Sequence, residues 1–126
     1  MKRFLLALGI LLCMQCCTFA RNLLDLENGS YVDLDSLRTD GNYGYALFEA
    51  PFRYDPRFRI SLLEEFDLLN NKVHAIKGYM LDFRGKIISI VEESELSQDD
   101  REWGNIPKGS IYWIILETLK KIRTVR

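Results

Sequence analysis

Residues 72–92 read KVHAIKGYMLDFRGKIISIVE, and this stretch decides the fold class. It holds two apolar, β-compatible runs, residues 72–83 and 86–92, on either side of Arg84-Gly85. A short glycine-containing segment between two such runs predicts a tight turn that joins antiparallel strands. Because residues 86–92 are almost entirely apolar, we expect their strand to be central in the sheet or covered by a helix.

The preceding residues predict more strands of the same kind. Asn28-Gly29 separates residues 23–27 from residues 30–34 and is the strongest short hairpin signal. Residues 36–43 are rich in Asp, Gly and Asn, so we expect a loop there, followed by a strand over residues 44–50.

Residues 57–69 allow two interpretations. Apolar and polar side chains alternate along them, which favours a strand whose inner face continues through Phe66 and Leu68. Ser61 and Glu64 have the spacing of a helix capping box, so a helix is the alternative. Asn70-Asn71 is expected to form the next turn.

The end of the chain predicts the one long helix. Ser110 suits the N-cap position, and a mostly polar loop is expected before it, over residues 93–105. Apolar spacing predicts a buried helix face made of Ile111, Ile114, Ile115, Thr118, Leu119 and Ile122. The prediction is an α+β domain: an antiparallel meandering sheet of five or six strands with a C-terminal helix packed on it.

Residues 1–20 predict a cleaved secretory signal peptide. Lys2-Arg3 precede an apolar run, and Thr18-Phe19-Ala20 places small residues before the cleavage point. The uncharged stretch is shorter than the roughly 20 apolar residues that span a bilayer. We therefore expect a single domain over residues 21–126 that does not span the membrane and resides in the periplasm or at the cell surface. Lipid anchoring at Cys16 or Cys17 is the less favoured alternative.

Composition excludes several classes of function. All three cysteines precede residue 21, so the mature domain is expected to have no disulfide and no reactive thiol. Residues 21–126 carry a formal charge of −3, because Lys2 and Arg3 fall in the leader and every acidic residue follows it. This balance gives no reason to expect nucleic-acid binding. The sequence has no glycine-rich phosphate loop, so it does not indicate a cofactor.

Three stretches of the chain, residues 30–37, 78–90 and 103–122, resemble the surface-adhesin protein E family of Gram-negative bacteria. The resemblance covers most of residues 30–122. The positions that carry it are Tyr31, Asp33, Ser36, Tyr79, Gly85, Lys86, Trp103, Ile106, Gly109 and Ser110.

The resemblance implies an antiparallel sheet with a flanking helix and an envelope or surface location. The name-giving members are adhesins that bind host matrix proteins. Members often carry a cysteine pair that this chain lacks, so it would be a divergent member.

Few residues suggest catalysis. His74 is the only histidine, and on a strand we expect it to be a surface residue or a satisfied core residue. Asp33 and Asp35 share a strand face, yet the glycine and terminal glutamate of a calcium loop are absent. Trp103 is expected to be a lid on the core. We predict no catalytic residue, no metal site, no cofactor and no enzyme activity.

Aromatic and arginine side chains give the only candidate for a partner-binding surface. They cluster in and around the loop bounded by Pro51 and Pro56, and both residue types are favoured in protein interfaces. The candidate binding residues are Tyr43, Phe52, Arg53, Tyr54 and Arg57.

The predicted function is that of an exported, non-catalytic envelope protein that acts through protein contacts and is adhesin-like, with a host matrix or envelope protein as partner. The alternative is a periplasmic domain that binds a small ligand or inhibits an enzyme, using a cleft between sheet and helix. An unpaired sheet edge could also pair with a second copy and form a homodimer.

Overall fold

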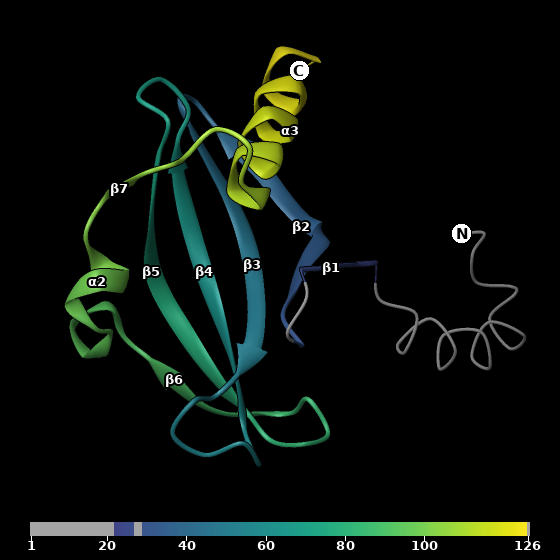
Figure 1. Ribbon diagram of the computed structural model, residues 1–126, viewed down its shortest axis with the longest axis vertical. Helices are drawn as coiled ribbons and strands as arrows, with labels where there is room; N and C mark the ends of the chain where they lie inside the picture. Colours follow the sequence, from purple (N-terminus) through teal and green to yellow (C-terminus); the bar gives the residue numbers. More distant parts are fainter. Residues whose placement is uncertain (1–21, 27–28, 126) are drawn as a thin grey trace, which may run out of the picture.

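The computed structural model describes residues 22–26 and 29–125, which form a seven-stranded antiparallel sheet with a long C-terminal helix packed on it (Figure 1). This architecture confirms the predicted α+β fold. The predicted signal peptide and Asn28 lie outside the described residues. The strands are β1 (Leu23–Asp25), β2 (Tyr31–Asp40), β3 (Tyr43–Pro51), β4 (Arg59–Asp67), β5 (Lys72–Leu81), β6 (Ile87–Val91) and β7 (Gly104–Asn105). The helices are η2 (Glu93–Glu95), α2 (Gln98–Arg101) and α3 (Ile111–Val125).

The strands form a meander in which each pairs with the next along the chain, from β1 to β6. The last strand, β7, returns to pair with the start of β5, so β6 and β7 share one edge of β5. Gly41, Asn71 and Gly85 occupy the turns with positive φ angles of 63°, 56° and 83°, which glycine and asparagine tolerate best. The turns predicted at Asn70-Asn71 and Arg84-Gly85 are confirmed.

The period-2 pattern of β4 gives the sheet two different faces. Phe66 lies on the face against which α3 packs, together with Ala46 and Phe48 of β3; we call this the helix face. Leu63 and Glu65 lie on the opposite side, the open face. The strand interpretation of residues 57–69 is thereby confirmed, with Phe66 and Leu68 fully or almost fully buried.

Helix α3 begins after Ser110, as predicted, and the Ser110 hydroxyl accepts a hydrogen bond from the Trp113 N–H. Its buried face is only partly the predicted one. Ile115 and Leu119 are buried, but Ile114 is 54 % exposed and Leu116 is fully buried instead. The helix is rotated toward Leu116 because the ring of Tyr112 stacks on Phe48, with centroids 4.8 Å apart.

Strand β2 is longer than predicted, because residues 36–40 extend it where the sequence predicts a loop. The polar residues there form a bulge between Asp33 and Arg38. The Ser36 hydroxyl donates to the Asp33 carbonyl at 2.6 Å and accepts from the Leu47 N–H at 2.8 Å, which replaces a ladder bond lost at the bulge. The polar composition therefore marks an irregular strand and not a loop.

Strand β6 is the clearest departure from the sequence prediction. The apolar pattern predicts a central or covered strand, but β6 lies at an edge and its isoleucines are about half exposed. The cause is the position of α3, which packs over β2 and β3 at the opposite side of the sheet (Figure 1).

The segment between β6 and α3 contains regular structure where the sequence predicts a polar loop. It forms η2, α2 and β7 in turn. Buried Leu96 holds this segment on the helix face, where it approaches Leu62 and Gly78. The many acidic residues of this segment predict a solvated loop, and for that reason the sequence did not indicate the buried contact of Leu96.

Gly44 provides a test of how tightly α3 packs on the sheet. A Cβ atom at Gly44 would lie 2.8 Å from Cδ1 of the fully buried Leu119, so we expect Gly44→Ala to destabilise the fold by about 1–3 kcal/mol. Chemical denaturation measures this as a lower midpoint with an unchanged slope. Gly104→Ala is the matched control, since its nearest neighbour, the Val73 carbonyl, is 3.9 Å away. Equal midpoints for the two variants would contradict close packing at Gly44.

Candidate functional site

The helix face is not fully covered, and a groove crosses it between α2 and α3. Two cavities, of about 360 Å³ and 270 Å³, share Ile60 and Leu62 of β4 as their apolar floor. We call them the outer and the inner cavity. The walls of the outer cavity include Phe52, Arg53, Tyr54, Ser97, Asp99 and Asp100. The inner cavity is lined on its far side by Leu26, Phe48, Glu64 and Tyr112.

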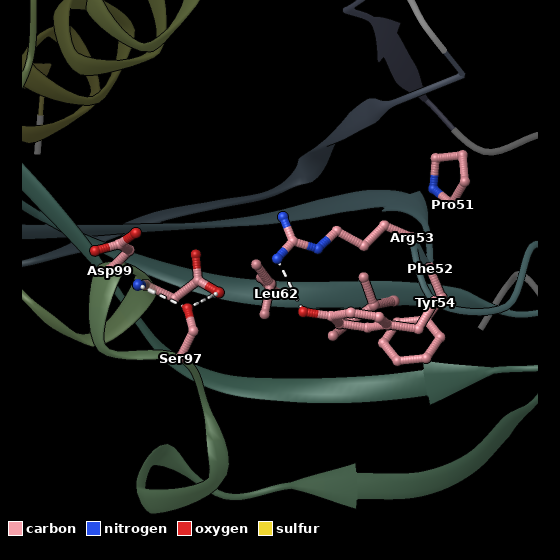
Figure 2. A pocket seen from close by; sticks show the side chains of 9 residues that line it. Pro51, Phe52, Arg53, Tyr54, Leu62, Ser97 and Asp99 are labelled. Atoms are coloured by element: carbon pink, nitrogen blue, oxygen red, sulfur yellow. Dashed lines mark hydrogen bonds between the residues drawn. The ribbon is translucent and has the colours of Figure 1, made fainter.

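One wall of the outer cavity is the short connection between β3 and β4. Backbone bonds from Phe52 to Phe58 and from Asp55 to Phe52 close this connection into a compact loop. Tyr54 packs edge-on against Phe52, and its hydroxyl accepts a hydrogen bond from Arg53 at 2.8 Å. Figure 2 shows Arg53 and Tyr54 extending from this loop over Leu62.

The opposite wall is the N-terminal end of α2. The Ser97 hydroxyl accepts from the Asp100 N–H and donates to the Asp100 carboxylate, at 3.2 Å and 2.9 Å. The pKa of Arg53 is raised, chiefly by its hydrogen bond to Tyr54, and Asp100 contributes to the shift. The outer cavity thus has a basic, aromatic wall facing an acidic one, as Figure 2 shows.

The inner cavity contains a buried carboxyl group. Glu64 is only 7 % exposed, and its Oε2 accepts a hydrogen bond from the Tyr112 hydroxyl at 3.2 Å. Burial raises the pKa of Glu64 from its ordinary value of 4.5 to about 7. Burial likewise raises the pKa of Tyr112, so the phenol stays protonated and remains a donor to the carboxyl group.

The structure brings together three of the five predicted binding residues. Phe52, Arg53 and Tyr54 line one wall of the outer cavity. Arg57 belongs to the same loop, but its guanidinium binds Asp55 at 2.9 Å and does not line the groove. Tyr43 lies at the other end of β3, where its ring is 6.3 Å from that of Trp103.

Sequence reasoning missed the inner half of the groove. Glu64 interrupts an otherwise apolar face of β4, between Leu62 and Phe66, and this position was the available signal. Tyr112 stands one residue outside the predicted helix face, so the pattern of apolar spacing did not select it. No local pattern indicated that α2 would bring Asp99 and Asp100 to the opposite wall.

His74 is a satisfied residue on the open face, one of the two roles that its sequence position predicts. Its Nε2 lies 2.8 Å from a Glu65 carboxylate oxygen, and its Nδ1 lies 2.9 Å from the Arg101 carbonyl. Trp103, predicted to cover the core, is 40 % exposed and stacks on His74 with centroids 3.7 Å apart.

Acidic and histidine side chains do not converge on a metal-binding geometry anywhere in the part of the chain that the structure describes. The Asp33 carboxylate accepts instead from the N–H of Asp35 at 3.0 Å, next to the bulge. Within residues 22–26 and 29–125, no helix has the length and apolar character needed to cross a membrane.

No family model matches the chain, and searches of curated proteins and of solved structures gave no match either. The resemblance to surface-adhesin protein E therefore stays a prediction from the sequence. The residues of the groove are the structural basis on which a function can be proposed.

Glu64 predicts a pH dependence of stability with a definite sign. The folded state binds the Glu64 proton more tightly than the unfolded state does, so this proton stabilises the fold. Its contribution to the free energy of unfolding is full below pH 4.5 and is lost as the pH rises to about 7. Glu64→Gln should remove a fall of a few kcal/mol in the free energy of unfolding over this window. Urea denaturation at several pH values measures it.

Glu93→Gln is the control for this experiment, because Glu93 is an exposed carboxylate on η2. It should keep the wild-type slope between pH 4.5 and 7. A Glu64→Gln protein that also kept this slope would show that a different group titrates there.

Proposed function

We propose that this chain is an exported, non-catalytic binding domain of the cell envelope that acts through protein contacts. Its partner-binding surface is the outer cavity, with Phe52, Arg53 and Tyr54 as the recognition wall. The bound part of the partner is an extended segment that places an apolar side chain on Ile60 and Leu62.

The observation that carries this proposal is the ordered cluster of Arg53 and Tyr54 at the mouth of an apolar groove. Tyr54 is 74 % exposed, yet its ring contacts Phe52 and its hydroxyl is bonded to Arg53. Exposed tyrosine and arginine side chains held in place before binding lose little conformational entropy when a partner arrives. The acidic wall at Asp99 and Asp100 adds a second set of polar contacts for the partner's backbone or basic side chains.

The sequence supports the location and the absence of catalysis in this proposal. Residues 1–20 have the order of a secretory signal, and the resemblance to surface-adhesin protein E implies an envelope role. His74, the only histidine, has both ring nitrogens engaged with Glu65 and Arg101, which leaves neither for a substrate.

A second candidate function is small-ligand binding in the inner cavity. It is favoured by the Tyr112–Glu64 pair, because a buried phenol and carboxyl group in an apolar cavity of about 270 Å³ are polar groups that orient a ligand. The two candidates differ in the residues on which binding depends.

Selection of a displayed library of random peptides against the wild-type protein tests the proposal. We expect selected peptides to contain an apolar residue and to lose at least about tenfold in affinity for Arg53→Ala and for Tyr54→Ala. Isothermal titration calorimetry with the selected peptides measures the loss.

Arg57→Ala is the matched control, because Arg57 lies in the same loop but outside the groove. It should bind selected peptides like the wild type. Equal binding by all three variants would overturn the proposed surface. Loss of binding confined to Tyr112→Phe and Glu64→Gln would favour the second candidate.

A further inference from the structure

Strand β6 leaves an apolar edge of the sheet unpaired. On one side it pairs with β5, and within the described residues no further strand lies beyond it (Figure 1). Its side chains Ile87, Ile88 and Ile90 are 54 %, 49 % and 52 % exposed. Proteins usually protect such edges with charges, proline or bulges. Residues 87–91 contain no charge and no proline, and the one such feature is an extra residue between Ile87 and Ser89, where the pairing of β6 with β5 shifts register.

The sequence around β6 is complementary to itself when read in the opposite direction. Residues 86–92 read KIISIVE, with a basic residue at one end, an acidic residue at the other and Ser89 at the centre. In an antiparallel pair centred on Ser89, Lys86 of each copy stands opposite Glu92 of the other. The isoleucines and Val91 then face one another between these charges.

We propose that two copies of this chain pair antiparallel through β6, with Ser89 on the two-fold axis and Lys86 of each copy opposite Glu92 of the other. The two sheets join into one continuous sheet. The pairing supplies partners for the unpaired backbone groups of the edge and reduces the exposure of the isoleucines to water.

A second copy fits this edge better than an unrelated strand does. A two-fold axis presents each copy with the reverse of its own sequence, and only a self-complementary strand gains from that arrangement. The side chains of Lys86 and Glu92 are exposed, so both can reach across the pair. Opposite charges directly across two strands stabilise the pair, and like charges destabilise it. The surrounding charges add to this, because Arg84 lies in the turn before β6 and Glu93 and Glu95 follow it.

A pair of charge-reversal variants tests the proposal. Sedimentation analysis of the protein as cells process it should show a monomer–dimer equilibrium for the wild type. In a dimer of Lys86→Glu, two carboxylates would face each other at both ends of the paired strands. In a dimer of Glu92→Lys, two ammonium groups would do so. We expect each variant alone to dimerise at least about tenfold more weakly.

The mixture of the two variants gives the sharpest outcome. Each homodimer of a single variant holds two like-charged pairs, whereas a heterodimer of the two variants holds none.

The proposed register makes a definite prediction for the mixture. Position 86 of one copy faces position 92 of the other, so Lys86→Glu in one copy meets Glu92→Lys in its partner, and native Glu92 meets native Lys86 at the other end. Both ends then hold opposite charges, and we expect a heterodimer with affinity close to that of the wild type.

Ile90→Lys tests the apolar part of the pairing. It should abolish dimerisation whatever its partner, while its denaturation midpoint stays near the wild-type value because the side chain is exposed. Three results would each overturn the proposal: a wild type that stays monomeric up to about 1 mM, single variants that dimerise normally, and a mixture that does not recover.

Discussion

The stacking of Tyr112 on Phe48 is the contact on which the rest of the structure depends. It sets the rotation of α3, so that Ile115, Leu116 and Leu119 face β2 and β3 and Ile114 faces solvent. It also fixes where the helix stops covering the sheet. Since α3 protects one side of the helix face and Leu96 anchors the segment on the other, the first half of β4 is left as the floor of a groove. The groove is thus a result of the incomplete cover that one helix can give to a sheet of this width.

Glu64 shows that the groove weakens the domain as well as shaping it. An apolar side chain at this position would extend the core between Leu62 and Phe66. The buried carboxyl group instead favours its neutral form, and among the described residues its hydrogen-bond donor is the Tyr112 hydroxyl. A domain predicted to lack disulfides depends on its apolar core for stability. A polar pair kept inside that core is better suited to binding than to stability, as are the exposed side chains of Arg53 and Tyr54 at the other end of the groove.

Local sequence signals predicted the turns, the strand at residues 59–67 and the start of α3, because glycine, asparagine, period-2 alternation and a serine N-cap act within a few residues. The predictions that failed concern what lies next to an element in space. The apolar composition of β6 shows that it can be buried, but only the position of α3 decides that it is not. Ser36 looked like a loop residue because its partner, the Leu47 N–H, lies on another strand. For the same reason the loop at residues 52–57 could be found from its aromatic and arginine content, while the opposite wall on α2 could not.

The order in which the chain closes on itself has a consequence for its synthesis. Every strand up to β6 pairs with its immediate predecessor, so the sheet can assemble progressively from local contacts. The core, however, is completed by the 15 residues of α3, which are made after all of these strands and pack against β2 and β3. Until α3 is made, the cluster around Val32, Ala46 and Phe48 lacks the helix side chains Ile115, Leu116 and Leu119. The core of the sheet is therefore completed late in synthesis, and a protein that loses the last two turns of α3 loses Leu119 and Ile122 from it.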